Sequence, residues 1–85
     1  IFVFSALKDK NYRLMLKKLI SKGEVIVTEF ESDRMAGALE LAQGQDVLVC
    51  HDYLQAVRYA LTKNKTLIVT GSLHFVSLVR NSFVK

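Results

Sequence analysis

The residues with the clearest chemical potential stand between Val69 and Phe75, where the sequence reads Val-Thr-Gly-Ser-Leu-His-Phe. Gly71 would let the backbone approach a ligand closely. Ser72 and His74 put a hydroxyl and an imidazole at the start of an expected helix, whose free N–H groups favour an anion. The ordinary roles of such residues are a helix N-cap for Ser72 and a surface position for His74, and from physical reasoning alone these roles are favoured. The segment is therefore a candidate binding site.

A second candidate is the pair His51-Asp52, which could exchange protons as an acid and a base. An Asp at this position more often caps the following helix, and we favour that role for Asp52. Cys50 has no partner at metal-ligand spacing, so we expect it to be a core residue. The sequence contains neither a G-x-G-x-x-G motif after its first apolar run nor a phosphate-binding P-loop. It therefore lacks the usual signals for holding a dinucleotide or the phosphates of ATP by itself.

Composition limits the classes of protein to which the chain can belong. Its 85 residues, of which 51% are hydrophobic and 24% charged, predict one globular domain. A single cysteine excludes a disulfide scaffold and fits a reducing compartment, so we expect a cytoplasmic location. No apolar stretch approaches the roughly 20 residues of a membrane-spanning helix, so no membrane partner is expected. The chain opens inside the apolar run Ile1 to Phe4 without Met, and we expect it to be a piece of a longer protein.

The net charge of +4 comes from 12 Lys and Arg against 8 Asp and Glu. Half of the basic residues fall in one short segment: Lys8, Lys10, Arg13, Lys17, Lys18 and Lys22. Such a cluster can attract phosphates or nucleic acid. Arg13, Lys17 and Lys18 lie opposite the apolar stripe of their helix, however, and no aromatic residues interleave with these bases as single-strand binders require. We therefore favour a solvated helix face and expect no nucleic-acid partner.

Apolar runs alternate with helical periodicity, and these elements must position the candidate residues. We expect strands at residues 1–7, 25–30, 47–50 and 67–70. The expected first helix has the stripe Tyr12, Met15, Leu16, Leu19 and Ile20, a cap at Asp9 or Asn11, and a left-handed Gly23 at its end. The second has a cap at Ser32 or Asp33 and the stripe Met35, Ala38, Leu39 and Ala42. The third has a cap at Asp52, the stripe Tyr53, Ala56, Val57, Ala60 and Leu61, and closure at Asn64. The last has a cap at Ser72 and the inward residues Phe75 or Val76, Val79 and Phe83.

These elements predict an α/β fold, a three-layer Rossmann-like domain with a mostly parallel sheet of about four strands from four βα units. Continuous apolar strands predict that both faces of the sheet are covered. Complete domains of this kind are usually longer, so we expect at least one strand to be missing on the N-terminal side and to leave an exposed edge. Ligands bind beyond the carboxyl ends of parallel strands, which assigns the functional edge to residues 8–11, 31–34, 51–52 and 71–74.

Three segments resemble, in order, motifs of the Mur ligase C-terminal domain of folylpolyglutamate synthases and bifunctional dihydrofolate synthases. Ala6-Leu7-Lys8-Asp9-Lys10-Asn11-Tyr12 is similar to the family's "gal-x-DKD-Y" segment. Residues 26–30 followed by Ser32-Asp33-Arg34 resemble its next strand and "Pro-Arg-Ala" loop, without the Pro. Residues 70–76, with Val79-Arg80 beyond, resemble its closing "TGSLYFV" motif, with His74 in place of Tyr. The family's Asp-Gly-Ala-His-Asn loop and its P-loop domain do not occur in these 85 residues.

The resemblance implies an ATP-dependent ligase that adds L-glutamate to folates, with ATP and Mg²⁺ held mainly by the absent P-loop domain. Residues 1–85 would form the C-terminal domain, which closes over ATP and helps to receive the incoming glutamate. Carried over by position, Ser72 and His74 face the interdomain cleft, and Asp9 and Lys10 lie on the loop after the first strand. The chain alone should not be catalytic. The choice between folylpolyglutamate and dihydrofolate synthesis depends on residues outside it.

Two other classes of function remain open at this point. In a phosphoacceptor signalling module, Asp52 would be the acceptor and Thr70 the hydroxyl, but residues 8–10 supply one acid between two bases where paired acids are needed. A non-catalytic docking domain would need no site at all. For any of these classes, an exposed sheet edge predicts self-association.

Overall fold

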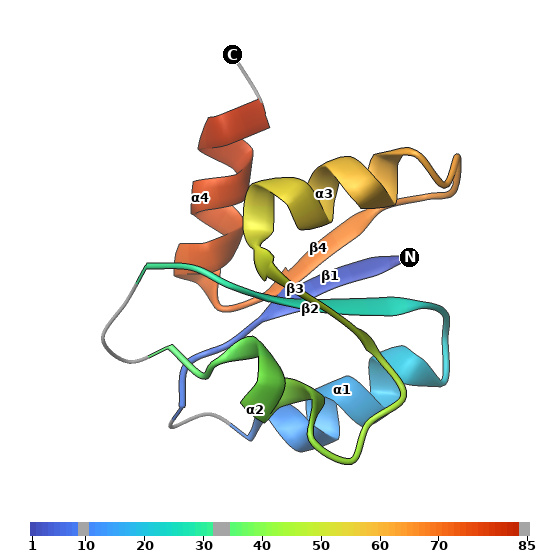
Figure 1. Cartoon of the computed structure of the whole chain (residues 1–85), viewed down its shortest axis with the longest axis vertical. Helices are drawn as coiled ribbons and strands as arrows, with labels where there is room; N and C mark the ends of the chain where they lie inside the picture. Colours follow the sequence, from blue (N-terminus) through green and yellow to red (C-terminus); the bar gives the residue numbers. More distant parts are fainter. Residues whose placement is uncertain (9–10, 32–34, 84–85) are drawn as a thin grey trace.

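The computed structural model describes residues 1–8, 11–31 and 35–83, in which four strands alternate with four helices (Figure 1). The elements are β1 (Phe2–Ser5), α1 (Tyr12–Ile20), β2 (Val25–Glu29), α2 (Ala38–Ala42), β3 (Leu48–Asp52), α3 (Tyr53–Leu61), β4 (Ile68–Gly71) and α4 (Leu73–Phe83). All strand pairs are parallel, and the strand order is β3-β2-β1-β4. Helices α1 and α2 lie on one side of the sheet, and α3 and α4 lie on the other. The predicted three-layer α/β fold is confirmed.

Two hydrophobic cores, one on each face of the sheet, hold the layers together. Because side chains alternate along a strand, Phe4 packs toward α1 and α2, whereas its neighbour Val3 packs toward α3 and α4. Leu16 fills the first core and Phe75 the second, and both are fully buried. The central strands β1 and β2 are therefore covered on both faces, as predicted.

The edge strand β3 departs from that prediction. Leu48 is 49% exposed and Val49 is 37% exposed, although both belong to a continuous apolar run. Strand β3 has a neighbour on one side only, and the α2 segment beside it is only five residues long. The apolar run predicted the strand, but it did not predict how much of that strand the helices cover.

Helix α2 begins later than predicted. Its N-cap is Gly37. Leu41 is buried in place of the predicted Leu39, which is 68% exposed. Met35 does not belong to the helix, since it forms an isolated antiparallel bridge with Leu7. The predicted caps Ser32 and Asp33 lie outside the described residues. The bridge to Leu7 thus keeps Met35 out of the helix.

The helix ends agree with prediction in part. Asn64 and Gly44 take positive φ values of 54° and 71°, which lets the chain turn after α3 and α2. Gly23 does not have the predicted left-handed conformation, and the C-cap of α1 is Ser21 in a right-handed conformation. Leu61 and Phe83 were predicted to point inward, but they are 57% and 37% exposed, because they lie at the ends of their helices.

The free edges of the sheet do not lie beside the first strand. Strand β1 pairs with β2 on one side and with β4 on the other, so it has no free edge. The edges of the sheet are β3 and β4. None of the helices in the described ranges combines the length and apolar character needed to cross a membrane.

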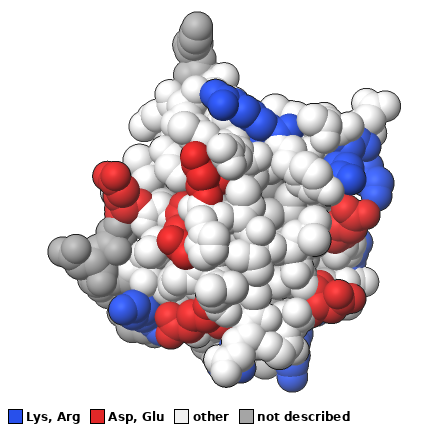
Figure 2. Space-filling view, in the orientation of Figure 1, with Lys and Arg blue, Asp and Glu red and all other residues white. Residues whose placement is uncertain are grey.

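Charged side chains do not gather into a continuous patch on the face shown in Figure 2, where the described Lys and Arg residues lie mainly along the margin and alternate with acidic residues. The basic residues of α1, Arg13, Lys17 and Lys18, are all exposed. This exposure agrees with the predicted solvated face, and the absence of a nucleic-acid partner stays a prediction.

Candidate functional site

The strand order creates a topological switch point between β1 and β4. The connection after β1 leads through α1 on one face of the sheet to β2, whereas β4 is followed by α4 on the opposite face. Because the two connections diverge, a crevice opens at the carboxyl ends of these strands, where open parallel sheets bind their ligands.

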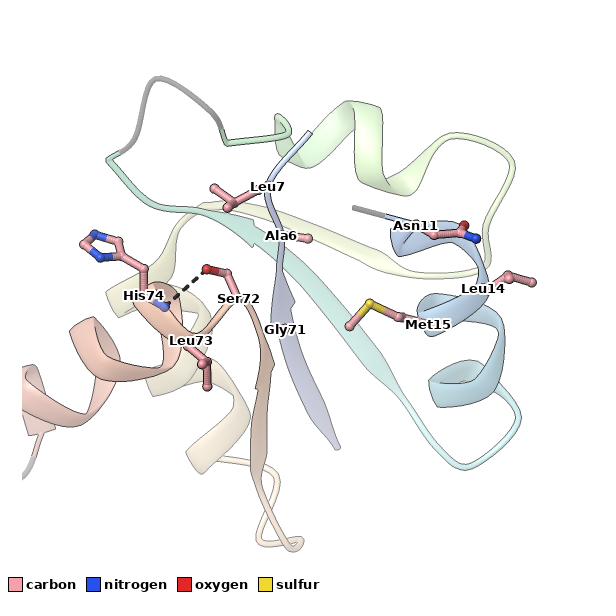
Figure 3. A pocket seen from close by; sticks show the side chains of 9 residues that line it. All are labelled: Ala6, Leu7, Asn11, Leu14, Met15, Gly71, Ser72, Leu73 and His74. Atoms are coloured by element: carbon pink, nitrogen blue, oxygen red, sulfur yellow. Dashed lines mark hydrogen bonds between the residues drawn. The ribbon is translucent and has the colours of Figure 1, made fainter. Parts of the chain in front are cut away.

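A cavity of about 700 Å³ occupies this position, and we refer to it as the β1–β4 crevice (Figure 3). Its lining residues are Ala6, Leu7, Asn11, Leu14, Met15, Gly71, Ser72, Leu73 and His74. Met15 points from α1 across the crevice toward the end of β4, whereas Leu14 points outward. The segment that the sequence marked as chemically promising therefore does line a cavity, together with the segment after β1.

Gly71 gives the crevice its shape. Its φ of +117° is a conformation that side-chain-bearing residues rarely adopt, and a Cβ atom at this position would overlap the carbonyl oxygen of Ser5. The same carbonyl oxygen accepts a hydrogen bond from the N–H of Ser72 at 3.0 Å. Glycine is needed here because the ends of β1 and β4 approach so closely.

Ser72 has the predicted cap role. Its Oγ accepts a hydrogen bond from the backbone N–H of His74 at 3.2 Å. The imidazole of His74 is exposed and packs against the ring of Phe30, with ring centroids 5.6 Å apart. A ligand-binding role for these two residues stays a prediction. The other predicted site residues, Asp9 and Lys10, lie outside the described residues.

A second cavity, of about 300 Å³, lies at the carboxyl ends of β2 and β3, and we refer to it as the β2–β3 pocket. Its lining residues are Glu29, Phe30, Glu31, Met35, His51, Asp52 and Tyr53. The pairing of the two strands passes from Val27 opposite Val49 to Glu29 opposite Asp52, so β3 carries one extra residue. This β-bulge lets His51 approach Glu29 while Asp52 stays at the start of α3.

Glu29 contacts both a backbone N–H and an imidazole in this pocket. Its Oε2 lies 2.9 Å from Nδ1 of His51 and accepts a hydrogen bond from the N–H of Ala38 at 2.8 Å. The carboxylate thus caps α2 from a neighbouring strand, which explains the late start of that helix. These two partners, the Ala38 N–H first and His51 second, lower the pKa of Glu29 below its ordinary value.

The favoured role of Asp52, and not the alternative of an acid–base pair with His51, agrees with the hydrogen bonds of these two side chains. Asp52 has the favoured cap role, since its Oδ1 accepts a hydrogen bond from the N–H of Leu54 at 2.9 Å. His51 pairs instead with Glu29, a residue that the sequence did not single out. The available signal was a carboxylate at the carboxyl end of an apolar strand, the edge at which ligands bind.

The crevice and the pocket share a wall. His74 of the crevice packs on Phe30 of the pocket, and Leu7 of the crevice forms a backbone bridge with Met35 of the pocket. The two cavities are therefore neighbours along one edge of the sheet.

Neither cavity fits the ATP and Mg²⁺ that the family resemblance implies. Within residues 1–8, 11–31 and 35–83, His, Cys, Asp and Glu form no group of three that could hold a metal ion. The crevice is lined mainly by apolar side chains, and no P-loop is present to bind a triphosphate. Both groups would have to be held by another domain.

Comparison with models of protein families, with curated proteins and with solved structures found no match to this chain.

Proposed function

We propose that this chain is the C-terminal domain of an ATP-dependent acid–amino-acid ligase that adds L-glutamate to folates, with or without dihydrofolate synthase activity. In this proposal the domain supplies one wall of the cleft that receives the incoming amino acid, and a partner domain holds ATP and Mg²⁺. The isolated chain is not active. Because ATP, folates and glutamate are cytoplasmic, the proposal includes a cytoplasmic location.

The single observation that carries the proposal is the meeting of two segments at the β1–β4 crevice. The segment after β1 and the Gly71 to His74 segment lie far apart in the sequence, and both resemble motifs of the ligase family. At the topological switch point they line one cavity, which is where such a fold binds its ligands. The proposal accounts for this meeting with one shared ligand.

The test uses the longer protein that contains this chain, assayed for ADP formation that depends on both tetrahydrofolate and glutamate. Loss of a charge-assisted contact to a substrate costs about 10- to 150-fold in rate, and we expect a loss of this size for Ser72→Ala and His74→Ala. Ser77→Ala, an exposed serine further along α4, is the matched control and should keep the full rate. A parent protein without glutamate-dependent ADP formation would overturn the proposal. Unchanged kinetics in both variants would remove this segment from the site.

The strand order bears on the phosphoacceptor alternative. Signalling modules of that type have the order 2-1-3-4-5, which puts the third strand in the centre of the sheet. Here β3 is an edge strand, and β2 and β1 separate it from β4. With three strand spacings between them, Asp52 and Thr70 lie roughly 14 Å apart, too far to act on one phosphoryl group. Asp52 also caps α3. These observations favour the ligase proposal, and a mass shift after incubation with acetyl phosphate and magnesium would reverse that preference.

A further inference from the structure

Glu29 sets the direction of the hydrogen bonds that His51 can make. An ionised carboxylate only accepts hydrogen bonds, and the lowered pKa of Glu29 keeps it ionised at neutral pH. The contact of 2.9 Å between Glu29 Oε2 and His51 Nδ1 therefore requires a proton on Nδ1. In the neutral imidazole this leaves Nε2 with a free lone pair. His51 is 61% exposed, so the lone pair is accessible to a ligand.

The surroundings of that lone pair favour a cationic donor. The described lining of the β2–β3 pocket contains three carboxylates, those of Glu29, Glu31 and Asp52, and neither Lys nor Arg. The other titratable groups in this lining are the imidazole of His51 and the phenol of Tyr53. A primary ammonium supplies positive charge and several N–H donors, whereas a phosphate or a free carboxylate would be repelled. Helix α4 begins at the neighbouring crevice, and the N-terminus of a helix favours a carboxylate.

We propose that the β2–β3 pocket binds the ammonium group of an amino acid, with His51, oriented by Glu29, as the base that accepts its proton. In this step an N–H bond of the ammonium breaks and an N–H bond to Nε2 forms, which leaves a neutral amine and an imidazolium. Glu29 stabilises the positive imidazolium through the Nδ1–H contact, as carboxylates do in catalytic triads. Water then takes the proton from Nε2. The assignment deepens the proposed ligase function, because only the neutral amine can attack an acyl group.

The test compares two ligands and two variants of the 85-residue chain by NMR at pH 7. L-Glutamate is the probe, and N-acetyl-L-glutamate, which lacks the ammonium, is its matched control. We expect millimolar glutamate to shift the imidazole nitrogens of His51 and the amide of Ala38, and N-acetyl-L-glutamate to leave them unchanged. Nitrogen shifts of the free chain should show the proton of neutral His51 on Nδ1.

Glu29→Gln is the informative variant. Both contacts of Glu29 use Oε2, so an amide oxygen in that position would still accept from Ala38 and face Nδ1, while the negative charge beside His51 would be lost. Glutamate binding should then weaken by about tenfold or more, since the charge that stabilises the ammonium and the imidazolium is lost. Glu24→Gln removes the same charge at the opposite end of the sheet and should bind as the natural chain does. An unchanged amide spectrum away from the substitution confirms the fold of each variant.

The possible outcomes separate the ammonium assignment from the ligase proposal. Absence of a His51 shift at saturating glutamate, or equal shifts with N-acetyl-L-glutamate, would overturn the ammonium assignment. Shifts confined to Gly71 through His74 would overturn it too, while leaving the ligase proposal in place. Shifts at His51 in a chain whose parent shows no ligase activity would support the assignment and refute the ligase proposal.

Discussion

The β1–β4 crevice and the β2–β3 pocket lie side by side at one edge of the sheet, yet they are built differently. The backbone shapes the crevice, through the switch between β1 and β4 and the close approach of Gly71 to Ser5. The pocket depends also on a side chain, because Glu29 contacts Ala38 and His51 beside the β-bulge of β3. We therefore expect substitutions that alter the backbone conformation to damage the crevice, and substitutions that alter charge or protonation to damage the pocket.

The largest effect is expected for Gly71→Ala. The added Cβ would overlap the Ser5 carbonyl and would hold an L-residue at φ +117°, so we expect a loss of more than about 3 kcal/mol in the free energy of unfolding. Urea denaturation measures this loss. Gly44→Ala is the matched control, because Gly44 also has a positive φ but a Cβ added there would meet no atom within 4 Å, and we expect a loss of about 1 kcal/mol. Equal losses would show that backbone contact does not shape the crevice.

Loss of either helix cap, at Ser72 or at Asp52, should lower the stability of the domain by the same amount. Ser72→Ala and Asp52→Ala each remove a side-chain oxygen that accepts from a first-turn N–H, and each should lower the free energy of unfolding by about 1 kcal/mol. In a domain of this size that corresponds to roughly 4–8 °C in Tm. Thermal melts check the prediction. The crevice proposal also assigns Ser72 a contact with substrate, so Ser72→Ala should slow the parent ligase by more than its loss of stability explains. A Ser72→Ala variant that is destabilised but fully active would leave that residue with the cap role alone.

The pocket should respond to acid through Glu29. Because its folded-state pKa is lowered, its contribution to stability is fully present above the ordinary carboxyl pKa of about 4.3 and is lost as the pH falls through the lower folded value. Glu29→Gln should therefore flatten the acid limb of a plot of unfolding free energy against pH.

A matched comparison comes from Glu24, whose pKa is lowered mainly by its hydrogen bond and ion pair with Lys65. Both side chains of that pair are half exposed, so high salt should suppress the acid response of Glu24 more than that of Glu29, whose first partner is a backbone N–H. Equal salt sensitivity would argue that Glu29 acts through surface charge and not as the cap of α2.

The smallest effect concerns the outer side of the crevice, where β4 is a free edge. Ile68 is 46% exposed on that edge, and the strand from Ile68 to Gly71 contains no charge or proline to block pairing. We expect weak self-association at high concentration in analytical ultracentrifugation, and Ile68→Lys should reduce it. Leu48→Lys on the bulged edge strand β3 is the control and should have less effect. A chain that stays monomeric at millimolar concentration would contradict the prediction.

Local patterns in the sequence predicted much of this architecture. The order of four strands and four helices follows from apolar runs and helical periodicity. The caps at Asp52 and Ser72 were also predictable, because each cap contact spans only two residues of the chain. The loops at the carboxyl ends of the strands follow from the parallel sheet alone.

What the sequence by itself determined was therefore the fold class, the caps and the edge of the sheet at which a ligand would bind, because these depend on contacts between residues close in the chain. Only the tertiary structure decided that β1 is central, that α2 begins at Ala38 and that His51 meets Glu29. The last contact joins residues 22 positions apart, and it depends on the register and bulge of two paired strands. A periodic pattern does not specify a register to within one residue at a free edge, where neither face has to be fully buried.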